Sequence, residues 1–219
     1  TLNATANPSS LAATGWFRYG ASNPGVCSDT FGTRTPASGG TALGAGTTAV
    51  PYAAAVTGLS AGTTYYFCAI AESAAGTSFG AVLTFTTPAA PAVVTNPATQ
   101  VTGAGATLNG AASPNTLATT GWFRYSTSNP GSCNDTFGTR APSSGGVALG
   151  AGGASVAYSE VVSGLTPGTV YYFCAIAQNS VGTSVGSVLT LTTGRVPTVT
   201  TSAATLLTAT GATLNGSAN

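Results

Sequence analysis

The sequence predicts an all-β fold made of tandem β-sandwiches, with one disulfide in each repeat. Three observations support this prediction. The chain repeats itself at an interval of about 100 residues, which is the size of one sandwich domain. Short segments rich in Thr, Val, Tyr and Phe are separated by Gly- and Pro-containing turns, which is typical of strands. No segment shows the periodicity of a helix.

The internal repeat is the strongest of these observations. Thr1-Leu-Asn-Ala-Thr-Ala-Asn7 returns as Thr107-Leu-Asn-Gly-Ala-Ala-Ser113 and as Thr213-Leu-Asn-Gly-Ser-Ala-Asn219, an interval of 106 residues each time. Gly15-Trp-Phe-Arg-Tyr19 and Tyr65-Tyr-Phe-Cys-Ala-Ile-Ala71 recur at the same interval without a gap. The chain therefore contains two repeats and the opening of a third.

The register of the repeat predicts three segments. Residues 1–87 form a repeat that lacks its first strand, residues 91–193 form a complete repeat, and residues 197–219 supply the first strand and the start of the second strand of a third. About seven short strands are expected in a complete repeat, which favours a β-sandwich over other all-β folds.

The opening strand of the third repeat includes Val199, Thr200 and Thr201. Two interpretations of this strand are open. The chain is a window from a longer covalent array, or the strand fills the vacant edge of the first repeat in another copy, as a donor strand in a fibre.

Composition restricts the classes of partner. Only 4% of the 219 residues are charged, there is no His, and the net charge is +1. Nucleic-acid binding needs a clustered basic surface, and a membrane-surface helix needs a basic face, so neither partner is expected. No apolar run is long enough to span a bilayer as a helix. A surface with so little charge gives up like-charge repulsion and suits a protein that packs laterally.

The second half of each repeat resembles the fibronectin type III family. The residues that carry the resemblance are Gly164-Leu-Thr-Pro-Gly-Thr-Val-Tyr171, then Phe173, Ala175 and Ala177, and the closing Ser187-Val-Leu-Thr-Leu-Thr-Thr193. The Asn-Pro turn and the Trp-Phe-Arg-Tyr strand of the first half are similar to the version found in large bacterial secreted and surface proteins.

The resemblance implies roles for four residues. Leu59 and Leu165 are expected to plug the corner between the two sheets. Tyr65 and Tyr171 are expected to be the corner tyrosines, whose hydroxyl groups bond back to the backbone. The sequence departs from the family at its cysteines, which most such domains lack.

Each repeat has one pair of cysteines, Cys27 with Cys68 and Cys133 with Cys174. Four cysteines allow three pairings, and the repeat favours a disulfide within each domain. Alternation along the strand turns Cys174 away from the core, so the bridge is expected to fasten the long loop onto the outer face of one sheet. Disulfides imply an oxidising compartment and thus secretion. Zinc is the weaker alternative, because short ligand spacings and His are absent.

No catalytic or cofactor-binding set can be assembled from the sequence. Without His or Lys, most general-base and nucleophilic arrangements are missing. Asp29 and Asp135 are the only acids that recur, each near Arg34 or Arg140, and one acid per repeat favours a loop-stabilising Asp–Arg pair. Asn134 with Asp135 is a fragment of a possible calcium site. We expect no enzyme activity, no cofactor and no metal.

Aromatic residues are the remaining candidates for a binding surface. Alternation with core-facing neighbours predicts an outward-facing strip in each repeat. The residues of this strip are Trp16, Arg18, Tyr66, Trp122, Arg124 and Tyr172. The strip could stack on sugar rings or on a neighbouring subunit. Alternatively, each Trp packs under the long loop beside the disulfide.

These features lead to one functional hypothesis and one alternative. The hypothesis is a structural building block of an extracellular filament, stalk or surface fibre, which associates with itself or continues as the same repeat array. The alternative is a glycan-binding or spacer module of a secreted hydrolase or adhesin. In both cases the expected location is secreted, extracellular or at the cell surface.

Overall fold

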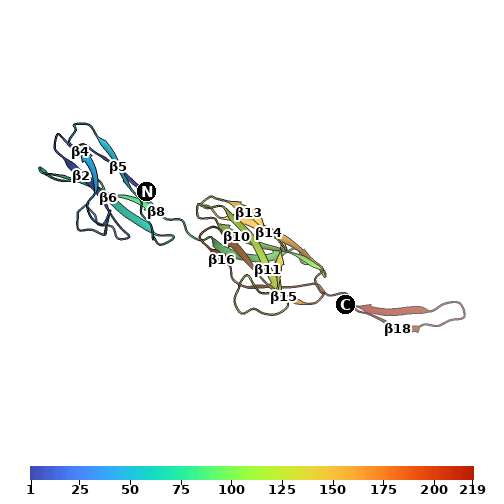
Figure 1. Ribbon diagram of the computed structural model, residues 1–219. Helices are drawn as coiled ribbons and strands as arrows, with labels where there is room; N and C mark the ends of the chain where they lie inside the picture. The colour runs from blue at the N-terminus through green and yellow to red at the C-terminus, as the bar shows by residue number, and fades with distance from the viewer. The chain divides into compact units, whose positions relative to one another are not determined.

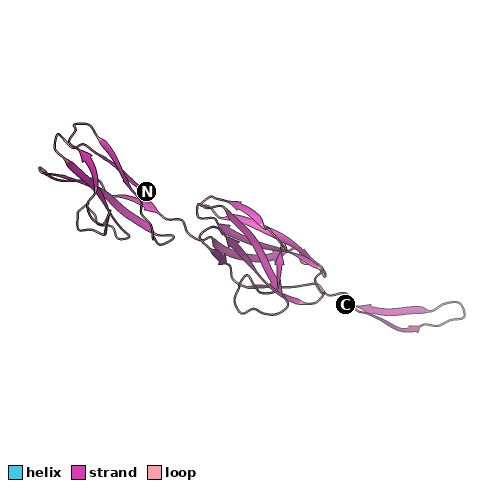
Figure 2. Ribbon diagram, viewed as in Figure 1, coloured by secondary structure: helices cyan, strands magenta, loops and turns pink.

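The computed structural model describes residues 1–219, and every regular element in it is a β-strand (Figures 1 and 2). The chain divides into two compact units, Thr1–Ala89 (unit 1) and Ala90–Asn219 (unit 2). No helix in the structure has the length and apolar character needed to cross a membrane.

Unit 2 contains a complete two-sheet sandwich in which all pairings are antiparallel. The first sheet has three strands in the order β14 (Val156–Ser163), β10 (Gly105–Ser113) and β9 (Ala92–Thr99). The second sheet has six strands, four of them in the order β12 (Thr139–Ala141), β11 (Thr119–Ser126), β15 (Val170–Gln178) and β16 (Thr183–Val185). In addition, β13 (Val147–Gly150) pairs with β11, and β17 (Leu189–Thr192) pairs with β15. This is a fibronectin-like, immunoglobulin-like fold.

Alternation along β15 divides its side chains between two environments. Phe173, Ala175 and Ala177 are fully buried in the main core between the sheets. Cys174 and Ile176 point to the other face, where they form a second, smaller apolar cluster. Successive strand residues point to opposite faces, so one strand serves both clusters.

A glycine in the repeated Gly-Trp-Phe-Arg-Tyr segment makes room for a buried tyrosine. A Cβ atom at Gly121 would lie 2.8 Å from Cε2 of Tyr158. The Tyr158 hydroxyl donates a hydrogen bond to the carbonyl oxygen of Ile176 at 2.9 Å. Gly15 and Tyr52 are related in the same way in unit 1, where the Cβ distance is again 2.8 Å. The close approach of the ring explains why this position needs glycine.

Unit 1 repeats this arrangement strand for strand except at one place. Its first sheet has only β1 (Leu2–Ala6) and β5 (Val50–Ala54), which correspond to β10 and β14. Its second sheet has the order β3 (Thr33–Thr35), β2 (Ala13–Gly20), β6 (Thr64–Ser73) and β7 (Gly76–Phe79). In addition, β4 (Thr41–Gly44) pairs with β2, and β8 (Leu83–Thr86) pairs with β6. No strand of unit 1 corresponds to β9.

The end of the chain forms a separate hairpin. Its strands β18 (Val199–Thr205) and β19 (Thr213–Ala218) pair with each other and with no other strand. By the sequence interval they correspond to β9 and β10, and they pair in the same register. Thr201 lies opposite Gly216, as Thr95 lies opposite Gly110.

The corner residues lie where the resemblance placed them. The hydroxyl oxygen of Tyr65 accepts a hydrogen bond from the Ser60 backbone at 3.0 Å, and that of Tyr171 accepts one from Thr166 at 3.0 Å. Leu165 is buried, and its counterpart Leu59 is partly buried.

Candidate interaction surfaces

The predicted strip lies on the outer face of the larger sheet in each unit. In unit 2, Trp122 is opposite Ile176 and Arg124 is opposite Cys174 in the pairing of β11 with β15. These residues therefore share one face, away from the main core, in the direction that the sequence predicted. The same register brings Trp16 and Arg18 of unit 1 opposite Ile70 and Cys68.

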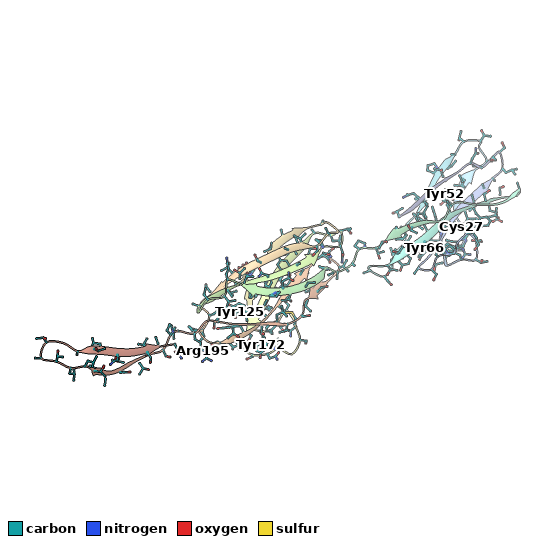
Figure 3. The ribbon with its side chains drawn as sticks, turned by 180° about the vertical axis from the view of Figure 1, so that it is seen from behind. Cys27, Tyr52, Tyr66, Tyr125, Tyr172 and Arg195 are labelled. Atoms are coloured by element: carbon teal, nitrogen blue, oxygen red, sulfur yellow. A yellow bond between two sulfur atoms is a disulfide. The ribbon has the colours of Figure 1, made fainter.

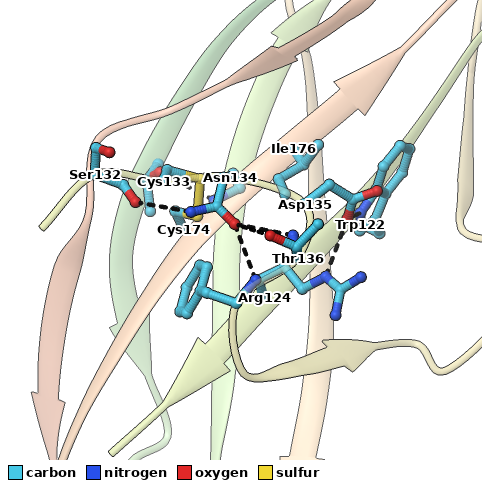
Figure 4. Close-up of a disulfide and its surroundings, with 12 residues drawn as sticks. Trp122, Arg124, Ser132, Cys133, Asn134, Asp135, Thr136, Cys174 and Ile176 are labelled. Atoms are coloured by element: carbon cyan, nitrogen blue, oxygen red, sulfur yellow. Dashed lines mark hydrogen bonds and ion pairs between the residues drawn. A yellow bond between two sulfur atoms is a disulfide. The ribbon is translucent and has the colours of Figure 1, made fainter. Parts of the chain in front are cut away.

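Each unit has its own disulfide on this outer face. The bridges join Cys27 to Cys68 and Cys133 to Cys174, each across 41 residues of sequence. Cys174 is fully buried, and it packs with Trp122 and Ile176 against Phe137 from the loop. The bridge therefore fastens the long loop over the sheet and does not cross the main core (Figure 4).

One carboxylate oxygen in each unit joins the loop to the sheet. Oδ1 of Asp135 accepts a hydrogen bond from Nε1 of Trp122 at 2.7 Å and one from Nε of Arg124 at 3.0 Å (Figure 4). In unit 1, Asp29 accepts equivalent bonds from Trp16 at 2.8 Å and Arg18 at 2.9 Å.

A second arginine, from the neighbouring strand β12 or β3, covers the tryptophan ring. The guanidinium carbon of Arg140 lies 4.6 Å from the centroid of the Trp122 ring, and that of Arg34 lies 4.4 Å from the Trp16 ring. Such cation–π contacts add to the packing of the ring. Arg140 also donates to the carbonyl oxygens of Pro142 and Gly145, in the turn between β12 and β13.

This arrangement corrects one sequence expectation and decides between two alternatives. The ion-pair partners of Asp29 and Asp135 are Arg18 and Arg124, whereas Arg34 and Arg140, which lie opposite them on β3 and β12, cover the tryptophan rings. Of the two arrangements that the sequence left open for the tryptophans, the structure has the one in which each ring packs under the long loop beside the disulfide.

The exposed fractions show how little of the strip is accessible. Trp16 is 3% exposed and Trp122 is 4% exposed, so neither ring is free to stack on a ligand. Tyr66 and Tyr172, labelled in Figure 3, are partly buried. The expected binding strip is thus in large part a means of holding the loop.

The hydrogen bonds of Asp29 change its acidity. Partial burial raises the pKa of this carboxyl group, but the hydrogen bonds from Trp16 and Arg18 and the charges of Arg18 and Arg34 lower it. The net effect is a lowered pKa, since these groups favour the ionised form. The carboxylate is therefore charged and held in place at neutral pH.

Asn134, the other residue of the predicted calcium fragment, shapes the loop. Its Oδ1 accepts hydrogen bonds from the backbone and hydroxyl of Thr136, at 2.9 and 2.7 Å, and from the backbone of Phe137 at 2.9 Å (Figure 4). This is a local Asx-type turn that presents Phe137 to the sheet.

A groove opens in unit 1 at the place that β9 occupies in unit 2. Its volume is about 490 Å³. It lies beside β1 and over β6 and β7, and its lining includes Thr5, Ala6, Ala69, Ala71, Phe79 and Gly80. Phe79 is 50% exposed. The sequence indicated the missing strand, but not which side chains its absence uncovers.

Comparison with protein-family models gave no match, and comparison with curated protein sequences gave none either. Among solved structures, the sensor domain of the anti-sigma factor RsgI4 from Pseudobacteroides cellulosolvens is similar with a TM-score of 0.32 and 16% identity, over 48% of this chain and 91% of that one. The FN1–FN3 domains of chicken CNTN1 give a TM-score of 0.36 and 13% identity, over 85% of this chain and 57% of that one.

Proposed function

We propose that this chain is a non-enzymatic structural building block of an extracellular filament, stalk or surface fibre, assembled from β-sandwich repeats that associate with one another. The two disulfides fit a secreted or extracellular protein, because such bridges persist in oxidising compartments.

The proposal rests on the role of the recurring polar and aromatic residues, which stabilise the domain from within. In each unit, one Trp, one Arg and one Asp hold the disulfide loop against the sheet, and a second Arg covers the Trp ring. Their side chains are engaged within the domain, so they serve its stability and not the recognition of a substrate.

The surface that remains is suited to packing. Only 4% of the residues are charged, and the exposed strand positions carry Thr, Ser, Ala and Gly together with apolar side chains such as those of Val94 and Val161. Such a surface brings little electrostatic repulsion when copies lie side by side. A stable, weakly charged sandwich is a suitable unit for a fibre.

Immunogold electron microscopy tests the proposal directly. An antibody raised against the purified chain is expected to label extended fibres or stalks on the source cells. Label confined to dispersed material in the medium would contradict it. A glycan array distinguishes the alternative, because specific polysaccharide binding by the intact chain would favour a carbohydrate-binding module.

A further inference from the structure

We infer that strand β14 of unit 2 is a contact between two copies of this chain, which pair edge to edge as antiparallel strands. The partner is a second copy, and the surface is the free edge of Val156–Ser163. The inference goes beyond the proposed assembly function by naming one lateral contact, and it rests on that function for its biological role.

Strand β14 stands at the end of the three-stranded sheet of unit 2 and pairs only with β10 (Figure 1). In an antiparallel strand, every second residue directs its N–H and C=O groups toward one neighbour, and the residues between them direct theirs to the other side. Outside the pairing with β10, the strand forms no backbone–backbone hydrogen bond. One row of its backbone groups is therefore unpaired, and an added strand can bind such a row.

A proline in unit 1 shows which residues direct their backbone groups outward. Pro51 of β5 lies opposite Thr5 of β1, and its counterpart in β14 is Ala157. Proline has no N–H, and it fits inside a strand only where its nitrogen faces away from the paired strand. The N–H of Ala157 therefore faces the free edge of β14, and so do those of Ser159 and Val161, which follow at intervals of two residues.

The same proline marks a difference between the two units. Proline on an edge strand removes a donor and hinders pairing with another chain, so it protects the edge. Unit 1 has this protection at Pro51, whereas unit 2 has Ala157 at the corresponding position. Val161, on the same strand, adds an apolar side chain that is 71% exposed. The edge of β14 is therefore open to pairing.

Strand β14 is complementary to itself in the antiparallel direction. With a two-fold axis at Ser159, this residue lies opposite Ser159 of the other copy, and Ala157 lies opposite Val161. Because these residues direct their N–H and C=O groups outward, they form hydrogen-bonded pairs. On the core side of the strand, Val156 lies opposite Val162. The register joins two three-stranded sheets into one of six strands, in a contact that closes at two copies.

Glu160 is the one charged residue of the strand. It lies opposite the buried Leu108 of β10, so its partly buried side chain is on the core side at the edge of the sheet. Across the axis, the two Glu160 side chains are diagonal neighbours, which lie about 7–8 Å apart, so their repulsion weakens the pairing without preventing it. Glu160→Gln is therefore expected to strengthen association by roughly twofold to fivefold. Weaker association of this variant would contradict the register.

The size of the contact predicts its strength. Eight residues of extended strand span about 27 Å, and one such edge buries less than the roughly 1,200 Å² of a stable interface. The association of two single copies is therefore expected to be weak and reversible. In an assembly of many copies, such contacts act together and their combined effect is much larger.

Sedimentation equilibrium of the intact, oxidised chain measures the association. The concentrations extend to about 1 mM, because a contact of this size is weak. We expect the mean mass to rise reversibly with concentration from one copy toward two. A monomer at every concentration would overturn the inference.

Ala157→Pro transfers the protection of unit 1 to unit 2. Since Pro51 occupies the corresponding place in a folded strand, the variant is expected to keep its fold, which circular dichroism and the thermal transition of unit 2 check. The lost donor and the proline ring should raise the dissociation constant at least tenfold. Unchanged association of the folded variant would overturn the inference.

Two matched substitutions test the contact without altering the backbone. Val161→Asp removes an apolar contact and places a charge beside Ala157 of the other copy, so it should weaken association roughly tenfold. Val94→Asp is the control, because Val94 is 58% exposed on the same face of the sheet but lies on β9, at the opposite edge. Equal effects of the two substitutions would contradict the inference.

Cysteine crosslinking tests the register. Ser159 lies on the axis, and the Cα atoms of a hydrogen-bonded antiparallel pair are about 5.5 Å apart, which a disulfide can bridge. Ser159→Cys is therefore expected to give a covalent dimer on mild oxidation with glutathione disulfide. Ser163→Cys is the control, because Ser163 is exposed on the same face but lies roughly 27 Å from its own copy. Equal rates of dimer formation would overturn the inference.

Two outcomes separate this inference from the proposed function. Surface fibres labelled by antibody, together with a chain that stays monomeric, would contradict the pairing and leave the proposed function standing. Pairing that Ala157→Pro abolishes, in the absence of labelled fibres, would support the contact and contradict the proposed function.

Discussion

Nε1 of Trp122 donates a hydrogen bond to Oδ1 of Asp135 across 13 residues of sequence, at a distance of 2.7 Å. The bond connects the middle of β11 to the loop that follows it, and the Cys133–Cys174 bridge connects the same loop to β15. Unit 1 repeats both connections. A long, Gly-containing loop is thereby fixed on the sheet from two directions, which limits the conformational freedom it would otherwise have.

Removal of the carboxylate is expected to loosen this loop. Asp135→Ala leaves the buried indole N–H of Trp122 and the Arg124 guanidinium without their acceptor, so unit 2 should lose about 1–3 kcal/mol of stability. Urea unfolding followed by tryptophan fluorescence measures the loss. Asp135→Asn keeps an acceptor oxygen and should cost less. No shift with Asp135→Ala would contradict the role given to this residue.

The disulfide of unit 2 is expected to contribute more to the free energy of unfolding than any single hydrogen bond does. Its loop spans 41 residues, for which the chain-entropy description gives about 4 kcal/mol. The double substitution of Cys133 and Cys174 by Ala should lower the melting temperature of unit 2 in scanning calorimetry. The matched pair Cys27 and Cys68 should act on unit 1 alone. A shift of both transitions by either pair would contradict independent domains.

Alkaline pH is expected to destabilise both units. Burial raises the pKa of Tyr52 and of Tyr158 above the ordinary value of 10.0. The folded protein therefore holds these protons to a higher pH than the unfolded chain does. Stability from this source is constant below pH 10 or so and falls as the pH rises further, because the unfolded state ionises first.

Thermal unfolding across alkaline pH checks this expectation. Tyr158→Phe removes one titrating group and should weaken the alkaline loss in unit 2. It should also cost about 1 kcal/mol at neutral pH, since the bond to the Ile176 carbonyl is lost. An unchanged pH dependence in this variant would show that Tyr158 is not responsible.

The sequence was informative where periodicity and repetition apply. Alternation placed Phe173 in the core and Cys174 outside it, and the constant interval of the repeat gave the missing strand of unit 1. Both results depend on local geometry that a strand imposes on its residues.

The sequence failed where contacts depend on the path of the loop. The sequence predicted an ion pair between Asp135 and Arg140, which is close to it along the chain. In the structure, Arg124 of β11 forms the ion pair with Asp135, and Arg140 covers the Trp122 ring. The sequence could not decide whether Trp122 is exposed or covered, because alternation gives the direction of a side chain and not what folds over it. Loop paths are set by long-range packing that no local pattern records.

The last prediction compares one substitution in two environments. Gly186→Ala would place a methyl group against the backbone of Thr95, 2.6 Å from its nitrogen, and the strand β9 cannot withdraw without losing its pairing with β10. Overpacking of this kind should cost unit 2 about 1–3 kcal/mol. In unit 1 no strand lies against the equivalent Gly80, so Gly80→Ala should change the stability of unit 1 by less than about 0.5 kcal/mol.

Calorimetry of the two variants separates the effects, because each should shift a different transition. Equal destabilisation would mean that the strain lies in the glycine's own backbone. A large effect confined to Gly186 would show that the inserted strand sets the requirement. Because the two positions correspond in the repeat, the difference between them measures how tightly a filled groove holds its strand.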